Sequence, residues 1–562
     1  MAVFAGQIRD IAGETEDYGL QPLKKVTLGS GFPVMIKVDS QIRAVPDNEG
    51  NPMSIQRNRR SFLTASTTGS LLAMSGPFGF LNHLPRLTAA EVALSPGMVR
   101  FDPEIEPLVR LIEETERPQL LKRVAARIQA GTSYQQVLAA LLLAGVRNVQ
   151  PRPSVGFKFH CVLCINSCHL ASLNGPDEDR WLPIFWALDY FKGAQADEAQ
   201  KTGWKMSTVN ESRVPSASQA RSLFMDAMER WDVEQADAAV AGLARTAGAT
   251  EIFNLFAQFA ARDFRSIGHK AIFLANSWRT LQVIGWDFAE PVLRSLVFAL
   301  LNSEGNKNPS EQDLPADRPW KQNALLLSQA WPENWKDGSL DDQAAKDLIA
   351  QFRSEDPQAT GRSAAAMIQR GVSPQSVWDA VFVGAGELLM RQPGIIGLHG
   401  LTTANAMNYL WRNVADDSLR LRLLLQACSF NTMFRDAAAG RGTLKSETID
   451  SLTKPEPVQE TSPTLDEIFA AVSTDKMRAS SAVRAYLAAG GQPEEFIAAA
   501  RRMTFLKGRD AHDYKFSSAV LEDTSHVSAH WRDQFLALSV FNLRGTGDRD
   551  NPVLDRTHEA FA

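Results

Sequence analysis

The sequence is poor in cysteine, in long apolar runs and in positive charge. Only four cysteines occur among 562 residues, and three of them lie between residues 161 and 168, which excludes a disulfide-stapled scaffold. No uninterrupted apolar stretch reaches the length of about 18 residues that a membrane span needs, so we expect no transmembrane helix beyond a retained signal segment. The formal net charge is −5, whereas a broad nucleic-acid surface needs a basic balance, so we expect no nucleic-acid partner.

Several common catalytic motifs are also absent. The sequence has no glycine-rich phosphate loop, no G-x-S-x-G nucleophile turn and no H-E-x-x-H pair. The enzyme classes that these motifs define are therefore excluded, and function has to be argued from individual side chains.

Residues 53–85 resemble a twin-arginine export signal. The run from Asn58 to Thr64 reads NRRSFLT, with paired arginines, a spacer and Phe-Leu, and a weakly apolar stretch follows it. Such signals normally begin a chain, and Met53 stands just upstream, so we interpret residues 1–52 as an upstream extension outside the fold. The alternative is a chance arginine pair before a core segment. The segment predicts an exported protein of the periplasm or cell envelope, with the signal either cleaved or retained.

The rest of the chain has the periodicity of helices. Apolar residues follow helical spacing from Ile105 to Ile112 and again from Leu120 to Ile128. Strand-like alternation is scarce after residue 90, and the one convincing strand-like run, residues 33–38, lies in the predicted upstream extension. The sequence therefore predicts an all-α protein.

A glycine turn recurs about every 120 residues, which is typical of a repeat architecture. The glycines are Gly131, Gly248, Gly371 and Gly490. In each case the glycine ends one predicted helix and a short polar segment opens the next. We expect four degenerate helical repeats, at residues 86–225, 226–345, 346–465 and 466–562. The polar, proline-bearing segments 302–320 and 442–463 are the expected linkers.

One histidine follows each glycine turn, and these four are the main candidates for a site. They are His160, His269, His399 and His512. The offset from glycine to histidine alternates between long and short, which indicates a duplicated two-repeat unit. An asparagine follows three of the histidines, at Asn166, Asn276 and Asn405, and Ser518 takes that place in the fourth. Each histidine falls near the start of a predicted inner helix, so all four can converge on the axis that relates the repeats.

Histidine is the commonest metal ligand and a natural acid–base at neutral pH. The four histidines therefore predict a site for iron or another transition metal. The alternative is that each is a core residue bonded to a backbone carbonyl. His526 and His530 form a second candidate metal pair, because the i, i+4 spacing would place them on one face of a helix.

The cysteine-rich segment from His160 to His169 has three interpretations. Cys164 and Cys168 could attach a c-type haem, but the spacing departs from C-x-x-C-H. Cys161 and Cys164 could form a redox pair like that of the AhpD-like peroxidases, although a cysteine stands where that family has its histidine. The three cysteines could also be small apolar residues that line a buried helix.

Two segments resemble the questin oxidase-like family. Residues 387–390 with residues 397–403 resemble its His-Val-Thr-Ser segment, and residues 159–163 resemble its Phe-His-Pro-Leu-Ile-His segment. Cys164 stands in place of that second histidine, and no glutamate follows at the expected place. Members of that family are α-helical, and their named activity is oxygenation of an aromatic polyketide by ring cleavage. The resemblance implies the helical fold and an oxygenation reaction for this chain, but not that substrate class. It also makes His160 and His399 the leading catalytic candidates.

Two functions from different classes follow. The first is an exported oxidoreductase or metal-dependent oxygenase that acts on a small molecule through histidines on inner helices. The second is a non-enzymatic helical-repeat protein that binds a protein partner in the cell envelope. The arrangement of the four histidines distinguishes them: convergence favours the enzyme, and scatter favours the binding protein.

Overall fold

The computed structural model describes residues 98–99, 101–151, 157–175, 177–303, 307–452 and 462–562. All of them belong to one compact unit, residues 85–562. The predictions of an upstream extension at residues 1–52, with its strand-like run, and of an export signal at residues 53–85 concern residues outside the described part of the chain.

The prediction of an all-α protein is confirmed. The described part of the chain forms α-helices and short 3-10 helices, and its extended pairing is confined to two isolated bridges, Met98–Ser207 and Ser339–Val372. None of the described helices is both long enough and apolar enough to span a membrane.

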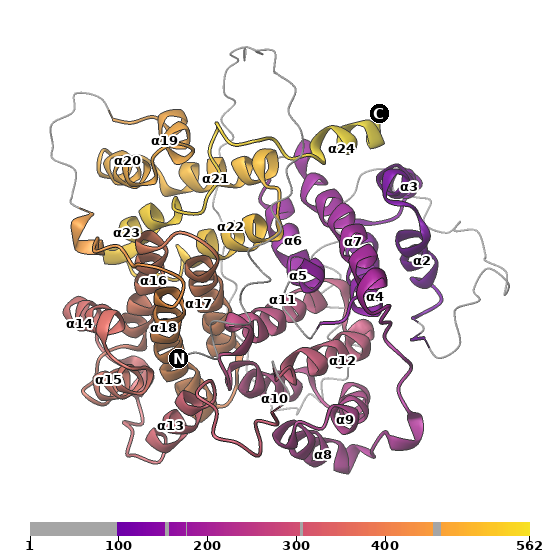
Figure 1. Ribbon diagram of the computed structural model, residues 1–562, viewed down its shortest axis with the longest axis horizontal. Coiled ribbons are helices and arrows are strands. Elements are labelled where there is room, and N and C mark those ends of the chain that lie inside the picture. Colours follow the sequence, from indigo (N-terminus) through magenta and orange to yellow (C-terminus); the bar gives the residue numbers. More distant parts are fainter. Residues whose placement is uncertain (1–97, 100, 152–156, 176, 304–306, 453–461) are drawn as a thin grey trace, which may run out of the picture. The chain divides into compact units, whose positions relative to one another are not determined.

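Most of the helices follow one another through short connections (Figure 1). The first group is α2 (Glu106–Glu114), α3 (Arg117–Gln129), α4 (Tyr134–Asn148), α5 (Phe157–Leu163), α6 (Ile165–Leu173) and α7 (Leu182–Lys201). Next come α8 (Ala217–Arg230), α9 (Val233–Thr246), α10 (Ala249–Ala261), α11 (His269–Ile284) and α12 (Ala289–Leu300). The third group is α13 (Arg318–Leu326), α14 (Asp342–Ser354), α15 (Pro357–Gln369), α16 (Pro374–Arg391), α17 (Ile395–Asn413) and α18 (Asp417–Ala439). The last is α19 (Leu465–Val472), α20 (Lys476–Ala488), α21 (Pro493–Lys507), α22 (Ala511–Asp523), α23 (Ala529–Ser539) and α24 (Leu554–Phe561). Longer connections precede, for example, α8, α13 and α19.

The predicted glycine turns join consecutive helices. Gly131, Gly371 and Gly490 follow α3, α15 and α20 with φ of 101°, 85° and 91°, a left-handed conformation that costs glycine little. Gly248 differs, because its φ is −76° and it serves as the N-cap of α10. In the first turn, Ser133 accepts a hydrogen bond from the backbone of Gln136 in a capping box, which fixes where α4 begins.

Four segments form a closed ring of inner helices at the centre of the unit (Figure 1). The α5–α6 pair packs on α11, α11 on α17, α17 on α22, and α22 back on α6. Most residues of these helices are buried, consistent with their apolar, small-residue sequences. We call them the inner ring.

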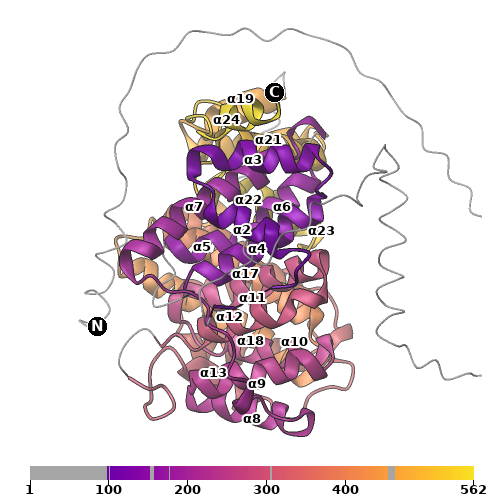
Figure 2. The same cartoon turned by 90° about the vertical axis from the view of Figure 1, so that its right-hand side faces the viewer.

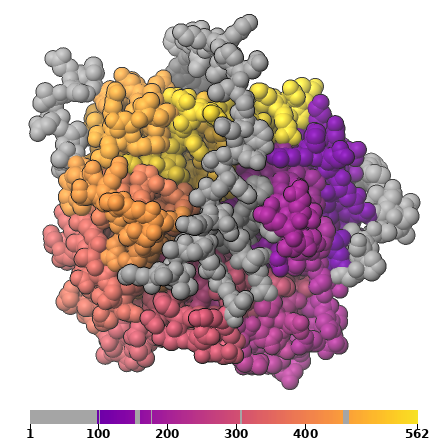
Figure 3. All heavy atoms as spheres, in the orientation of Figure 1, coloured from indigo at the N-terminus to yellow at the C-terminus, as the bar shows by residue number. Residues whose placement is uncertain are grey.

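The last helix closes the compact unit against the first ones. Helix α24 packs on α3 and α7. Figure 2 shows α24 with α19 and α21 at one end of the unit and α8 and α9 at the other. In Figure 3 the yellow surface of the C-terminal residues meets the indigo and purple surface of the first helices. Segments far apart in sequence therefore depend on each other for burial.

Candidate metal centre

Each segment of the inner ring carries one of the four predicted histidines near its N-terminal end. His269 is the first residue of α11 and His512 the second of α22, while His160 and His399 lie in the first turns of α5 and α17. His160, His269 and His399 are buried, with exposed fractions of 6%, 1% and 1%. The expectation that each histidine stands near a helix start is confirmed.

The four imidazole rings meet at the centre of the inner ring. The Nε2 atom of His269 lies 3.0 Å from Nε2 of His160 and 3.1 Å from Nε2 of His399. One ring nitrogen from each of His160, His399 and His512 lies within 4.8 Å of the others. The predicted convergence therefore holds for all four side chains.

The spacing of the rings alternates around this cluster. The ring centroids are 5.1 Å apart for His160 and His269, and also 5.1 Å apart for His399 and His512. The other two neighbouring pairs have 4.4 Å between His269 and His399 and 4.5 Å between His160 and His512. The two longer distances therefore match each other, and so do the two shorter ones.

Hydrogen bonds at Nδ1 fix the tautomer of three rings. Nδ1 of His269 lies 2.7 Å from the carbonyl oxygen of Ser266, and Nδ1 of His399 lies 2.6 Å from that of Ile395. Nδ1 of His512 lies 3.0 Å from Oδ1 of Asp510. Carbonyl and carboxylate oxygens accept, so each Nδ1 carries the hydrogen, and Nε2 of the neutral ring presents a lone pair.

The buried rings are neutral at neutral pH. Burial lowers the pKa of His160, His269 and His399 well below 6.5, and the neighbouring histidines and Lys515 lower it further. The facing Nε2 atoms of His269 and His399 are then two lone pairs only 3.1 Å apart. Such an arrangement is repulsive unless a cation lies between the atoms.

The separations of Nε2 of His269 from Nε2 of His160 and of His399, 3.0 Å and 3.1 Å, fit neighbouring ligands of a single metal ion. Imidazole nitrogens bind such ions at about 2.0–2.1 Å, so two neighbouring ligands lie roughly 3.0–3.4 Å apart. Nε2 of His512 is buried and has no hydrogen-bond partner among the described residues. A hydrogen bond at the other ring nitrogen is the usual support that orients a histidine ligand.

A strained turn places His269. Ser266 and Ile267 have φ of 57° and 43°, and Gly268 follows with φ of 80°. A Cβ atom at Gly268 would lie 2.0 Å from Oγ1 of Thr403 on α17, so only glycine allows this approach. Left-handed conformations at non-glycine residues cost about 1–3 kcal/mol and gather at functional sites. Here the turn brings His269 against the helix that carries His399.

Two charged residues complete the cluster. Lys515 is buried on α22, and its Nζ lies 3.4 Å from Nε2 of His269. Burial lowers the pKa of Lys515 to about 7. Burial alone would raise the pKa of Asp510, but hydrogen bonds from His512 and the charge of Arg544 bring it down to about 2, so Asp510 is ionised. Neither residue was among the sequence candidates, although both lie within one helical turn of His512.

The predicted pairing of His526 and His530 on one helical face is wrong. Helix α22 ends at Asp523 and α23 begins at Ala529, so His526 lies in the turn between them. Nδ1 of His526 is 3.3 Å from Asp523, whereas Nδ1 of His530 is 3.3 Å from Asp342. The metal-competent group found among the described residues contains neither histidine.

The cysteines behave as small core residues. Cys161, Cys164, Cys168 and Cys428 are all buried and free. Burial raises the pKa of the Cys161, Cys168 and Cys428 thiols, so these three stay protonated and unreactive. The structure favours the third interpretation of the cysteine-rich segment.

Comparisons with protein-family models, curated proteins and solved structures find no match to this chain. The resemblance to the questin oxidase-like family and the twin-arginine signal therefore stay predictions. The case for function rests on the histidine cluster.

Proposed function

We propose that the chain binds one transition-metal ion through the Nε2 atoms of His160, His269, His399 and His512. One observation carries this proposal: three of the rings are anchored through Nδ1, and all four rings converge. Ordinary core histidines on four separate helices would not need to converge on one point. The anchored rings present lone pairs, which is the state in which imidazole binds a metal.

The donor set narrows the choice of ion. Four neutral imidazoles suit iron, copper, nickel or zinc, and the site has no carboxylate among its proposed ligands. Asp510 accepts a hydrogen bond from Nδ1 of His512 and supplies one negative charge close to the proposed ion. Our proposed activity, oxidation or oxygenation of a small molecule, calls for a redox-active ion, and iron is our first candidate.

The enzyme proposal is favoured over the non-enzymatic binding protein. Under the latter, the histidines would be scattered and each satisfied locally. His269 and His399 do bond to local carbonyls, but only through Nδ1, while their Nε2 atoms face each other. We propose that the protein is an exported oxidoreductase or metal-dependent oxygenase. Its catalytic candidates are His160 and His399, which lie in the segments that resemble the questin oxidase-like family.

The four-repeat organisation is also a proposal. It is supported by the matching ring distances, which pair His160 with His399 and His269 with His512 as a duplication would. It is further supported by the repeated order of a glycine turn, a helix and a histidine-bearing helix. The metal would then lie on the axis between the two halves.

Metal binding tests the proposal directly. The purified full chain should take up one equivalent of Fe²⁺ or Co²⁺, measured by elemental analysis and by titration. Replacing His160→Ala or His399→Ala removes a ligand, so the affinity should fall by at least about 100-fold, more than is typical of outer-shell changes. The melting temperature measured with EDTA should change little, because the facing lone pairs already cost stability.

His526→Ala is the matched control, because His526 is also partly buried beside a carboxylate but lies outside the cluster. It should keep full metal affinity. A chain that binds no divalent ion, or one in which all three variants bind equally well, would refute the proposal. A large loss of stability in the two cluster variants without any metal effect would make these histidines plain core residues.

A further inference from the structure

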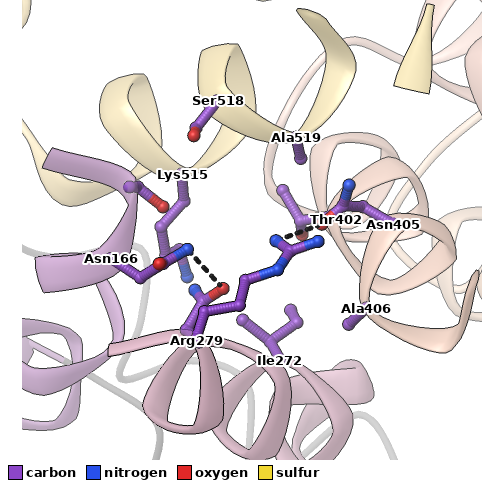
Figure 4. Close-up of a pocket in the computed structure, with 11 residues that line it drawn as sticks. Asn166, Ile272, Arg279, Thr402, Asn405, Ala406, Lys515, Ser518 and Ala519 are labelled. Carbon is purple, nitrogen blue, oxygen red and sulfur yellow. Dashed lines mark hydrogen bonds between the residues drawn. The ribbon is translucent and has the colours of Figure 1, made fainter. Parts of the chain in front are cut away.

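A polar pocket lies among the inner helices (Figure 4). One of its lining residues, Lys515, contacts His269 of the histidine cluster. Its lining includes the residues that follow the four histidines by six or seven positions, namely Asn166, Asn276, Asn405 and Ser518. A helix rises about 1.5 Å per residue, so these residues stand roughly 9–10 Å from the histidines along the inner ring. The same four helices therefore supply both the ring of histidines and a ring of polar side chains.

Lys515 connects the two rings. It lines the pocket, and its Nζ is also 3.4 Å from Nε2 of His269. The corresponding position, three residues after the histidine, is Ile272 on α11 and Thr402 on α17, and both line the same pocket. Lys515 is thus the one ionisable side chain at this level of the lining, and it faces both the cluster and the pocket.

The charge of the lining favours an anion. Arg279 and Lys515 are its two ionisable residues, and both are bases, which an anion holds in their cationic forms. Arg279 is paired with Glu522 at 3.0 Å, and its side chain is 12% exposed, so it stands at the outer side of the pocket. Lys515 is buried deep beside the histidines and is the cation that a bound anion would meet there.

The polar groups of the lining hold one another weakly. Nδ2 of Asn166 is 3.5 Å from Oδ1 of Asn276, and Nη1 of Arg279 is 3.4 Å from Oδ1 of Asn405. These distances are at the limit of hydrogen bonding, and Oγ of Ser518 is buried with no hydrogen-bond partner among the described residues. The amide of Asn276 already donates to the carbonyl oxygen of Leu163 at 2.8 Å, and that of Asn405 donates to Glu522 and Asp523. The groups available to a ligand are therefore the amide of Asn166 and the hydroxyl of Ser518, and the small space between them admits only a small ligand.

We propose that this pocket binds a small anion, such as a carboxylate group, in reach of the metal, with Lys515 donating a hydrogen bond to it. The inference rests on the proposed metal site. Once a metal takes the Nε2 lone pair of His269, Lys515 loses the acceptor it has at 3.4 Å, and its N–H groups turn to the pocket ligand. The hydroxyl of Ser518 and the amide of Asn166 hold the remaining polar atoms of the ligand.

The test uses azide as the probe anion on the full chain loaded with Co²⁺, whose visible spectrum reports the coordination of the ion. Azide should change the spectrum of the wild-type protein saturably. Lys515→Met should weaken azide binding by about tenfold or more, since it removes a charge-assisted hydrogen bond. Ser518→Phe should abolish it by filling the pocket. Lys476→Met is the control, because Lys476 is another partly buried lysine, bonded instead to the carbonyl oxygen of Leu543, and its azide affinity should be unchanged.

The two proposals fail separately. Absence of Co²⁺ uptake overturns the metal site. Normal Co²⁺ uptake with no spectral response to azide, or with the same azide affinity in Lys515→Met and Ser518→Phe as in the wild type, overturns the pocket. Because Ser518 is partly exposed, Ser518→Phe keeps the test decisive should Lys515→Met fail to fold.

Discussion

Asp523 is a carboxyl group in the interior, beside Asn405 of the polar pocket. Its Oδ1 accepts a hydrogen bond from Asn405 at 2.9 Å, and Nδ1 of His526 lies 3.3 Å away. Its Oδ2 is buried without a hydrogen-bond partner among the described residues. Burial raises the pKa of Asp523 from 3.8 to about 6, in spite of the opposing effect of His526.

The raised pKa predicts a pH dependence of stability. The folded protein holds the Asp523 proton more tightly than the unfolded chain does, so this group stabilises the fold most below about pH 4 and progressively less up to about pH 6. Asp523→Asn removes the titration. The free energy of unfolding of the variant, relative to wild type, should rise by about 1–3 kcal/mol between pH 4 and pH 7. Urea unfolding at several pH values, with EDTA present, measures it, and a constant difference would contradict the prediction.

Individual side chains also show what the sequence could reveal about the site. The four histidines could be selected because each follows a glycine turn at a regular distance. Lys515 and Asp510 could not, because a charged residue near a helix end usually faces solvent. Only the packing of α22 inside the ring buries Lys515, and only the structure shows that the exposed Asp510 accepts a hydrogen bond from His512. The second cation of the pocket, Arg279, is likewise recognisable only once four separate helices are brought together.

At the scale of helices, two ion pairs to one carboxylate connect α24 with α3 and α7. Asp189 of α7 is buried and binds Arg117 of α3 and Arg556 of α24, each at 2.7 Å. Burial would raise the pKa of Asp189, but the two arginines outweigh burial and lower it. The carboxylate is therefore ionised and connects three helices.

Removing this carboxylate should weaken the packing of α24. Asp189→Ala leaves two arginines without their shared partner, and we expect a loss of about 1–3 kcal/mol, less than for a fully buried pair because both arginines are partly exposed. Chemical denaturation measures the loss. Asp226→Ala is the control, since its ion pair with Arg230 is exposed on both sides and should contribute less than about 1 kcal/mol. Equal effects of the two substitutions would count against the proposed tie.

Helix prediction succeeded where local signals were strong and failed where they were not. The glycine turns and the linkers before α13 and α19 could be read from the sequence, because glycine conformation and helix periodicity are local properties. The pairing of His526 and His530 failed, because an i, i+4 spacing says nothing about whether the helix continues between the two residues. Here α22 ends before Val527 and Ser528, and Ser528 becomes the N-cap of α23.

At the scale of the whole molecule, the sequence could not reveal which helices touch. The order of the inner ring, with α22 returning to α6, depends on contacts between residues hundreds of positions apart. Spacing suggested that the histidines share an axis, but it gave no distance and no tautomer. The structure gives the distances, and the carbonyl and carboxylate groups beside Nδ1 of His269, His399 and His512 give the tautomers of those three rings.

The compact unit that begins at Pro85 leads to a prediction about the leader. A chain that starts at residue 85 should keep the melting temperature and metal content of the full chain, because the four histidines and their supports all lie beyond that point. If residues 53–85 are the export signal that we propose, the shortened chain should also lose export. Calorimetry and elemental analysis test the first part. Attaching residues 53–85 to a reporter, with Arg59→Lys and Arg60→Lys as the control, tests the second. A destabilised short chain, or export of the double variant, would contradict the prediction.

The joining of the last helix to the first has a consequence for biosynthesis. The proposed ligands run from His160 to His512, and α24, which covers α3 and α7, follows all of them. At ordinary translation rates the ribosome takes on the order of tens of seconds to pass from the first ligand to the last. The nascent chain must therefore wait with its early helices partly uncovered, and all four histidines are available to the proposed metal ion only after residue 512 has been made. Loading of that proposed ion would then be a late step, in the compartment where the inner ring closes.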